Sequence, residues 1–316
     1  MHVAHFPSDE SPGWIRPVAA LGNFDGVHRG HQRILDHVKR QAALSGGVPV
    51  VVTFDPHPPR VVRPEKAPPL LMTLNQKLEA FERAGIHRVA VAQFTPEMAR
   101  WEPEAFVDAV LVDWLGVAEV CVGANFLFGR DRTGTFTLLK ALGEYRGFRV
   151  DCIEPVRYKD FVVSSTRVRH LITEGRVDEA AALLGHHYVL DGVVIHGEKR
   201  GREIGFPTAN LQTANELLPA HGIYATLAIV NGVQYRAVTS VGVRPTMTEG
   251  PSAGQVTIEA YLMDVSMDLY GQTMRLGFVQ WLRPEEKFDS LEALSAQIAR
   301  DCDVGRQVFA RAGLLK

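Results

Sequence analysis

The chain has 316 residues, of which 46% are hydrophobic and 22% are charged, and its formal net charge is -2. This length exceeds what one hydrophobic core usually organises, so two domains are expected, and the composition argues against extensive disorder. The near-neutral charge excludes a global basic field that would attract nucleic acid or an anionic membrane, so any phosphate site must be local.

In the first half of the sequence, short apolar runs alternate with stretches of helical periodicity. The runs cover residues 18–21, 48–54, 89–94 and 117–122, with a weaker fifth at 150–153. Helical spacing is kept by Ile34, Leu35, Val38 and Ala42, and again by Leu74, Leu78 and Phe81. The alternation predicts a parallel sheet covered by helices, as in doubly wound, Rossmann-like α/β domains. The Pro-rich residues 56–69 are interpreted as a long loop at a sheet edge.

After Ser164 the pattern becomes helical and then strand-like. Two helical stretches, the second ending at Gly185 as a C-cap, form the predicted junction. Strand-like segments follow at residues 188–195, 223–230, 234–241, 256–263 and 273–281. Asn231 and Gly232 lie between two of them, as a tight hairpin requires. The second half is therefore predicted to be a small antiparallel β-barrel.

The sequence ends in a predicted amphipathic helix that should close one side of the barrel. Its N-cap is either Asp289 or Ser290. Its expected apolar face consists of Leu291, Leu294, Ile298, Cys302 and Phe309.

The first candidate site is the run LGNFDGVHRGH at residues 21–31, directly after the first predicted strand. Ligands of α/β sheets bind beyond the carboxyl ends of strands, and anions bind at helix N-termini. Gly22, Gly26 and Gly30 permit positive φ and close backbone approach to a phosphate chain. His28 and His31 can donate hydrogen bonds to a phosphoryl group under attack. The alternatives are surface histidines without a ligand, or half of a metal site.

A second phosphate-binding candidate precedes the junction helix. Ser164, Ser165 and Thr166 can cap that helix and offer hydroxyl and N-H groups to a phosphate, while Arg169 projects one turn further toward it. The alternative is an ordinary capping box.

These motifs carry a family resemblance. The H-x-G-H pattern of His28, Gly30 and His31 resembles the nucleotidylyltransferase superfamily, and GNFDGVHRGH resembles the prokaryotic bifunctional riboflavin kinase/FMN adenylyltransferase family, also called FAD synthetase. GANFLFG at residues 123–129, followed by Arg132 and Gly134, and SSTRVR at 164–169 match two further motifs of that family. Relatives often carry Asp at the position of Asn125.

The resemblance implies the reaction FMN + ATP → FAD + pyrophosphate, with the FMN phosphate as the attacking group and Mg²⁺ sharing the charge stabilisation. It implies catalytic roles for His28, His31 and Arg169. Nucleotide or phosphate binding is assigned to Gly22, Phe24, Gly30, Asn125, Ser164, Ser165 and Thr166. Phe54, His57 and Phe128 are the flavin-binding candidates, although Phe54, at a strand end, is equally a candidate for the core.

The second candidate site is the run GREIGFPTAN at residues 201–210. Its glycines and Arg202 suit a loop over ATP phosphates, and Thr208 and Asn210, two apart on an extended segment, offer neutral oxygens to Mg²⁺. The alternative is a plain connector.

GFPTAN resembles the hallmark of riboflavin kinases, and the matches continue through GIY at 222–224, GVRPT at 242–246 and DLYG at 268–271. The resemblance implies Glu259 as the catalytic base that takes the proton of a riboflavin hydroxyl. It also implies ATP-binding roles for Gly201, Arg202 and Gly205. Ser240 stands where relatives commonly have Asn.

From the resemblance, residues 1–183 are expected to form the FMN adenylyltransferase domain and residues 184–316 the riboflavin kinase domain. Riboflavin, FMN and ATP are the expected small-molecule partners, with no nucleic acid and no membrane, and flavoprotein apoenzymes are possible acceptors of the product. Competing interpretations are a nucleotidylyltransferase for another substrate, such as pantetheine phosphate or nicotinate mononucleotide, and a barrel that binds flavin without turnover.

Three scattered cysteines, Cys121, Cys152 and Cys302, lack metal-ligand spacing and favour a reducing compartment. The first 14 residues lack the features of a secretory signal, and no run of about 18 apolar residues occurs. We therefore expect a soluble, cytoplasmic protein.

Overall fold

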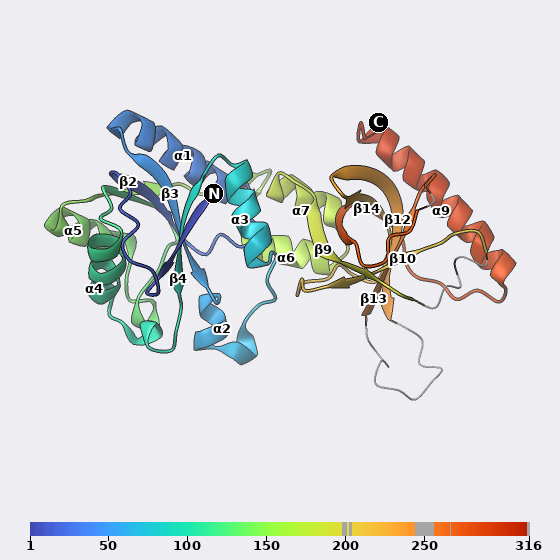
Figure 1. The fold of residues 1–316 in the computed structure, drawn as a ribbon, viewed down its shortest axis with the longest axis horizontal. Coiled ribbons are helices and arrows are strands. Elements are labelled where there is room, and N and C mark those ends of the chain that lie inside the picture. Colours follow the sequence, from blue (N-terminus) through green and yellow to red (C-terminus); the bar gives the residue numbers. More distant parts are fainter. Residues whose placement is uncertain (198–200, 202–203, 244–255, 266, 315–316) are drawn as a thin grey trace. The chain divides into compact units, whose positions relative to one another are not determined.

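The computed structural model describes all residues except 198–200, 202–203, 244–255, 266 and 315–316. The chain divides into two compact units, Met1–Ser165 and Thr166–Lys316, which Figure 1 draws in blue to green and in yellow to red. Each unit has its own sheet and core and is described by itself.

The first unit is built on a six-stranded, fully parallel sheet. Its strands are β1 (His2–Phe6), β2 (Pro17–Leu21), β3 (Val48–Asp55), β4 (Arg88–Gln93), β5 (Glu119–Gly123) and β6 (Arg149–Ile153), in the order β1-β4-β3-β2-β5-β6. Five of these strands confirm the predicted runs. The sixth, β1, was not predicted, because it is short and only partly buried and pairs with β4 alone at the sheet edge.

Helices cover both faces of this sheet. Helices α1 (Arg29–Ser45) and α3 (Leu74–Arg83) share a core with Val18, Ala20 and Cys121. On the opposite face α4 (Pro103–Phe106), η3 (Val107–Trp114) and α5 (Phe136–Arg146) pack on alternate residues of the same strands. The Pro-rich segment is not a plain loop, since it contains α2 (Pro58–Val62) and η1 (Pro64–Lys66). Two further short turns are η2 (Met98–Arg100) and η4 (Arg130–Arg132).

The strand order reverses at β2. From β2 the chain adds β3 and β4 on one side, and then returns to place β5 and β6 on the other side. In open α/β sheets this switch point is where ligands bind, beyond the carboxyl ends of the two central strands. The loops after β2 and β5, which carry the histidine and Asn125 motifs, begin at that place.

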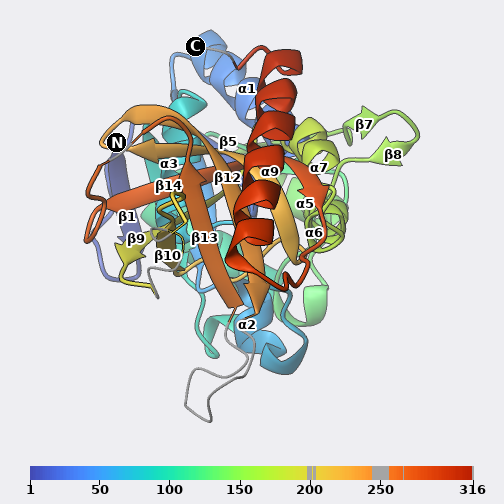
Figure 2. The ribbon, with the colours of Figure 1, turned by 90° about the vertical axis from the view of Figure 1, so that its right-hand side faces the viewer.

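The second unit begins with helices α6 (Ser165–Thr173) and α7 (Val177–Leu184), followed by a closed antiparallel barrel. The barrel order is β10-β13-β12-β11-β14-β9, with bounds β9 (Tyr188–Ile195), β10 (Ala209–Thr213), β11 (Gly222–Val230), β12 (Val233–Val243), β13 (Val256–Leu262) and β14 (Thr273–Arg283). A small hairpin, β7 (Arg157–Tyr158) and β8 (Phe161–Val162), belongs to the first unit. Figure 2 shows the barrel strands with the terminal helix across them.

The structure confirms the predicted turn and cap positions of this half. Asn231 and Gly232 have φ of 50° and 78°, as a hairpin turn between β11 and β12 requires. Gly185 caps α7 at φ 80°. Ser290, not Asp289, caps the terminal helix α9 (Leu291–Arg311) by accepting a hydrogen bond from the N-H of Ala293.

Helix α9 packs on the outside of the barrel through Cys302, Val308 and Phe309, against Ala225, Val238 and their neighbours. The prediction of its apolar face was wrong at one end, because Leu291 is 48% exposed. The periodicity is correct, but the first turn extends past the barrel wall on which the rest of the helix packs.

Candidate active sites

The turn after β2 is a strained segment. Gly26 has φ 87°, and Phe24 and Val27 have φ of 51° and 38°, a region that side-chain-bearing residues rarely adopt. Of the three predicted glycines, only Gly26 uses positive φ. Gly22 and Gly30 instead allow neighbouring side chains to approach the backbone closely. A Cβ on Gly30 would lie 3.1 Å from ring atoms of His28. The glycines thus make room for side chains of the turn itself.

The two histidines form a stacked pair at the N-terminus of α1. His28 is the N-cap, and its Nδ1 accepts a hydrogen bond from the backbone N-H of His31 at 3.3 Å. Their rings lie 3.6 Å apart, 15° from parallel. Burial, followed by the neighbouring His28 and Lys77, holds the pKa of His31 well below its usual value. His31 is therefore neutral at pH 7 and presents an imidazole rather than an imidazolium.

Within the part of the chain that the structure describes, the buried Nδ1 of His31 has no hydrogen-bond partner. A buried polar atom in this state costs free energy unless something binds it. A phosphate oxygen of a bound nucleotide would be a suitable partner for this nitrogen when it carries the ring proton.

Two charged residues that sequence reasoning missed support this turn. The buried carboxylate of Asp25 accepts hydrogen bonds from the N-H groups of Leu71, at 3.0 and 3.1 Å, and Met72, at 3.2 Å. Lys77 on α3 is only 6% exposed, and burial lowers its pKa although Asp25 and Asp55 raise it. The helical pattern around Lys77 identified the apolar face of the helix. Nothing in the sequence indicated that the lysine side chain is itself buried.

The serine motif reaches the same turn. Ser165 Oγ donates a hydrogen bond to the carbonyl oxygen of Asp25 at 2.8 Å. The carbonyl oxygen of Val163 lies 3.8 Å from where a Cβ on Gly30 would be. Ser164 is half-buried next to them. Thr166 and Arg169 are counted with the second unit, and their contribution stays a prediction.

Most of the aromatic candidates are buried in the hydrophobic core of the first unit. Phe54 and Phe128 are both buried and both contact Phe106, with ring centroids 5.9 and 6.0 Å away. Phe128 also stacks on Phe126 at 5.5 Å. The structure thus brings these two predicted residues into one aromatic cluster, in which Phe54 belongs to the core.

The remaining candidates of the first unit differ in exposure. His57 is buried and precedes α2, whereas Asn125 is exposed on the loop after β5. Phe24 is buried, with its ring 5.6 Å from Phe81 and 5.1 Å from His31. Its side chain supports the turn from the core side.

In the second unit the structure brings the predicted kinase residues together. Asn210 on β10 lies directly opposite Glu259 on β13, and Ser240 on β12 lies opposite Glu259 on its other side. Thr208 Oγ1 donates a hydrogen bond to Glu259 Oε2 at 3.3 Å. Residues directly opposite in a ladder point to the same face, so hydroxyl, amide and carboxylate oxygens gather at one place on the barrel wall.

The backbone before β10 packs closely on this group. A Cβ on Gly197 would overlap the side-chain amide of Asn210, and one on Gly201 would overlap the carbonyl oxygen of Phe206 and touch Thr208 Oγ1. Gly205 has φ 83°, a conformation that favours glycine. Arg202 lies outside the described residues, as do Arg244, Pro245 and Thr246 of the GVRPT match.

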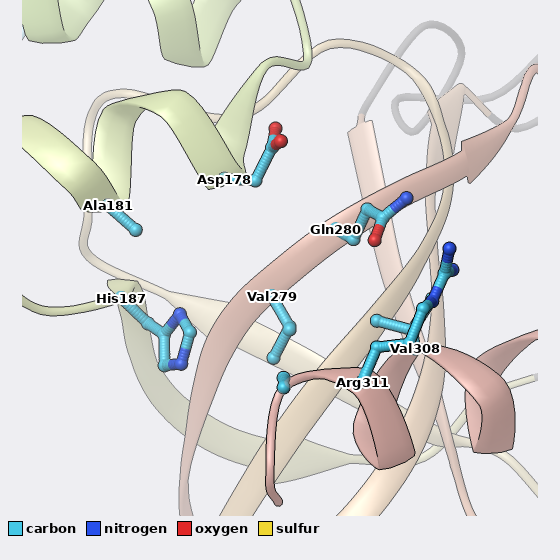
Figure 3. A pocket seen from close by; sticks show the side chains of 8 residues that line it. Asp178, Ala181, His187, Val279, Gln280, Val308 and Arg311 are labelled. Carbon is cyan, nitrogen blue, oxygen red and sulfur yellow. The ribbon is translucent and has the colours of Figure 1, made fainter.

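A surface hollow of about 370 Å³ lies elsewhere in the second unit, between α7, β14 and α9. Figure 3 shows Asp178, His187, Gln280 and Arg311 around it. Its lining, as far as the described residues go, includes none of Thr208, Asn210 and Glu259. We assign it no part in the chemistry.

The two folds and the two sites define a two-domain phosphoryl- and nucleotidyl-transferring enzyme. Family models confirm each half: residues 12–167 match FAD synthetase, and residues 184–309 match riboflavin kinase. The chain belongs to the bifunctional riboflavin kinase/FMN adenylyltransferase family, which makes it an enzyme of the two steps from riboflavin through FMN to FAD.

Relatives from several bacteria cover almost the whole chain. The bifunctional riboflavin kinase/FMN adenylyltransferase of Pseudomonas fluorescens is 38% identical over 93% of this chain and 93% of its own length. The protein of the same name from Listeria monocytogenes is 38% identical over 94% of each chain. A crystal structure described as a macrolide-efflux protein from Streptococcus pneumoniae superimposes with a TM-score of 0.86 at 28% identity, covering 96% of this chain and 98% of that one.

In the described part of the chain, no helix is both long enough and apolar enough to span a bilayer.

Proposed function

We propose that the turn after β2 is the adenylyltransferase site and that its histidine pair binds the ATP phosphates. The observation that supports this proposal is the stacked pair at the N-terminus of α1, at the switch point of the sheet, where a buried ring nitrogen of His31 has no hydrogen-bond partner among the described residues. His28 and His31 stabilise the charge that grows on the phosphoryl oxygens. The attacking FMN phosphate is already an anion, so alignment and charge stabilisation suffice.

The other residues of the first unit take supporting roles in this proposal. Gly22, Gly30, Ser164, Ser165 and Thr166 approach the phosphates, and Arg169 adds a positive charge. Asn125 binds the ribose or the flavin, and Phe128 and His57 form part of the flavin side. Phe24 and Phe54 act from the core, as supports of these loops. Lys77 is a further basic group buried near Asp25 and His31, and burial lowers its pKa.

We propose that Glu259 is the base of the kinase reaction, taking the proton of the riboflavin hydroxyl that attacks ATP. Its carboxylate lies on the barrel wall beside Thr208 and Asn210. Gly201, Arg202 and Gly205 form the loop over the phosphates.

The oxygens of Thr208 and Asn210, next to a carboxylate, are the hard donors that Mg²⁺ prefers, so this group fits the ion. When bound, Mg²⁺ neutralises charge on the ATP phosphates. Thr208 and Asn210 would hold the ion, and Glu259 would accept the proton of the riboflavin hydroxyl.

For domain limits we propose residues 1–183 for the adenylyltransferase and 184–316 for the kinase. The start of the riboflavin kinase match at residue 184 supports this, whereas compactness groups α6 and α7 with the barrel. We further propose that the reactions take place in the cytoplasm and that apo-flavoproteins receive the product.

Incubation of the pure protein with riboflavin, Mg²⁺ and ATP tests the whole proposal. FMN should appear first and FAD second, as followed by chromatography. Consumption of ATP with neither riboflavin nor FMN as acceptor would overturn it.

A further inference from the structure

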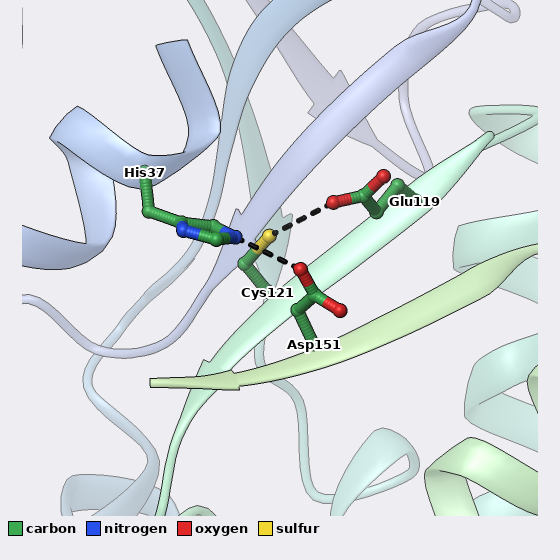
Figure 4. A group of neighbouring side chains, drawn as sticks. All are labelled: His37, Glu119, Cys121 and Asp151. Atoms are coloured by element: carbon green, nitrogen blue, oxygen red, sulfur yellow. Dashed lines mark hydrogen bonds and ion pairs between the residues drawn. The ribbon is translucent and has the colours of Figure 1, made fainter. Parts of the chain in front are cut away.

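Four metal-ligating side chains converge in the first unit, on the α1 side of the sheet. His37 comes from α1, Glu119 and Cys121 from β5, and Asp151 from β6. Figure 4 shows the imidazole of His37 directed from the helix at the Cys121 sulfur and the Asp151 carboxylate. Glu119 and Cys121 are two apart on one strand, so both face α1, and Cys121 is the register partner of Asp151.

The distances between the donor atoms are already close to those in a metal site. One donor atom from each residue lies within 4.8 Å of each of the others. His37 Nε2 is 2.9 Å from Asp151 Oδ2, and Cys121 Sγ is 3.7 Å from Glu119 Oε1. Tetrahedral Zn²⁺ with bonds of 2.0–2.3 Å places its ligand atoms about 3.3–3.7 Å apart. Shifts of about an ångström, within the reach of side-chain rotation, therefore suffice.

The electrostatics of the cluster suit a divalent cation. Glu119 is only 2% exposed, and its carboxylate forms an ion pair with Arg149 and accepts a hydrogen bond from the Cys121 thiol. Two carboxyl groups, a thiol and an imidazole thus lie together beside one guanidinium group, which gives the cluster an excess of donor groups suited to a divalent cation.

An entry path exists as well. The side chains of His37 and Asp151 are 21% and 44% exposed, so the site is closed on the sheet side and accessible between the helix and strand β6.

We propose that His37 Nε2, Glu119, Cys121 Sγ and Asp151 bind one divalent transition-metal ion of the Zn²⁺ class, as a structural site that joins α1 to β5 and β6. Sulfur and imidazole donors select such an ion over Mg²⁺. On binding, the Sγ-H bond of Cys121 breaks, its proton leaves to solvent, and a sulfur-metal bond forms. The site is separate from the phosphate-binding turn, although both lie on α1.

Co²⁺ is the probe for the site, because a thiolate-bound tetrahedral Co²⁺ absorbs strongly in the visible and near-ultraviolet. The full-length protein is stripped with a chelator and titrated with Co²⁺ in the absence of nucleotide and flavin. We expect one ion per chain, a sulfur-to-cobalt band, displacement by an equivalent of Zn²⁺, and a higher unfolding temperature with Zn²⁺.

Three variants locate the ligands. Cys121→Ser should lose the sulfur band, and Asp151→Asn, at a partly exposed position, should weaken Co²⁺ binding at least tenfold without endangering the fold. Cys152→Ser is the matched control, because Cys152 follows Asp151 on β6 and faces the other side of the sheet. Absence of stoichiometric binding, a band that survives Cys121→Ser, or a band lost equally in Cys152→Ser would overturn the proposal. These readouts do not depend on catalysis, so they are independent of the proposed function.

Discussion

At the residue scale, the two histidines proposed to bind phosphate are held in place by contacts within the turn. His28 is fixed by its capping hydrogen bond and by the space that Gly30 leaves, and His31 is fixed by stacking on His28 and by the ring of Phe24. If a nucleotide binds here as proposed, neither ring has to change its conformation. Preorganised donors of this kind are effective in stabilising transition-state charge, because no reorganisation is required during the reaction.

His28→Ala and His31→Ala should each reduce FAD formation from FMN and ATP by about 10²- to 10³-fold, as removal of one such donor typically does. FMN formation from riboflavin should continue in both variants. Initial rates of the two reactions, measured separately by chromatography, make the test. An unchanged adenylylation rate would remove these residues from the mechanism.

The low pKa of His31 has a consequence for stability. Its folded-state pKa lies below the ordinary value near 6.5, so below about pH 6.5 the unfolded chain binds a proton that the folded chain does not. The free energy of unfolding should therefore decrease as the pH falls from 7.5 to 5.5, by at most about 1.4 kcal/mol per pH unit from this group.

Urea unfolding at several pH values checks this, with the slope of stability against pH as the quantity compared. His31→Asn should have the shallower slope. His187, whose pKa is also lowered by burial, contributes in the same direction in both proteins and cancels in the comparison. Equal slopes would show that His31 titrates normally in the folded state.

Glu259→Gln keeps the shape of the side chain and removes the base. FMN formation should fall by about 10²- to 10⁴-fold, while FAD formation from supplied FMN remains. Asp303→Asn, which removes an exposed carboxylate of α9, is the matched control and should change neither rate. A Glu259→Gln variant with normal kinase activity would contradict the role of the carboxylate.

At the scale of elements, two helical glycines differ in what surrounds them. A Cβ on Gly30, in the first turn of α1, would press on the His28 ring at 3.1 Å. A Cβ on Gly305, inside α9, would meet Val238 and Phe309 at ordinary contact distances of 3.5 and 3.8 Å. Glycine inside a helix costs about 0.5–1 kcal/mol relative to alanine.

Gly305→Ala should therefore raise the free energy of unfolding by about 0.5–1 kcal/mol and leave both activities unchanged. Gly30→Ala should lower adenylylation by displacing His28, and kinase activity should persist. Thermal unfolding and the two separate rate assays distinguish the pair. If Gly30→Ala retained full adenylylation, the ring of His28 would not need its present position.

The elements that sequence alone predicted are those with strong periodicity or a fixed turn residue. The four central strands of the first sheet, β4, β3, β2 and β5, are largely apolar runs because both faces are covered, and the Asn231-Gly232 turn requires residues that tolerate positive φ. β1 and β10 were not predicted as strands. Their strand character depends on partners far away in the sequence, because β1 pairs with β4 alone and β10 pairs with β13.

The candidate sites followed from motifs, whereas their environment did not. The sequence places Thr208 and Glu259 51 positions apart, and only the barrel register shows that they form a hydrogen bond. Lys77 was missed because burial of a charge leaves no mark in a helical pattern, and Asp25 was missed because the turn motif does not indicate that its carboxylate binds the backbone N-H groups of Leu71 and Met72. The same holds for Cys121, whose lack of regular ligand spacing argued against a metal site until the sheet register placed it beside Asp151.

At the scale of the whole molecule, the two compact units have separate cores, and the two proposed sites rest mainly on different units. A core substitution in one unit should therefore affect one activity first. Phe278, fully buried in the barrel, is a suitable position, since Phe→Ala changes in a core cost about 3–5 kcal/mol.

Phe278→Ala should lower the temperature at which FMN formation is lost, whereas FAD formation should survive to the temperature at which it is lost in the unsubstituted protein. Phe81→Ala, in the core of the first unit, should have the opposite effect. Activity remaining after heating for a fixed time, assayed for each reaction, provides the measurement. Parallel loss of both activities in both variants would show that the units unfold together.

The edge strand β1 has a practical consequence for anyone who shortens this protein. The family match begins at residue 12 and the first recognisable apolar run at Val18, so a cut between them would seem harmless. Such a cut would remove β1, the outer neighbour of β4. It would leave a row of unpaired N-H and C=O groups on β4, beside the apolar residues Val89, Ala90 and Val91. Bare edges of this kind recruit strands from other molecules. Such a truncated protein should tend to precipitate even with both active sites intact.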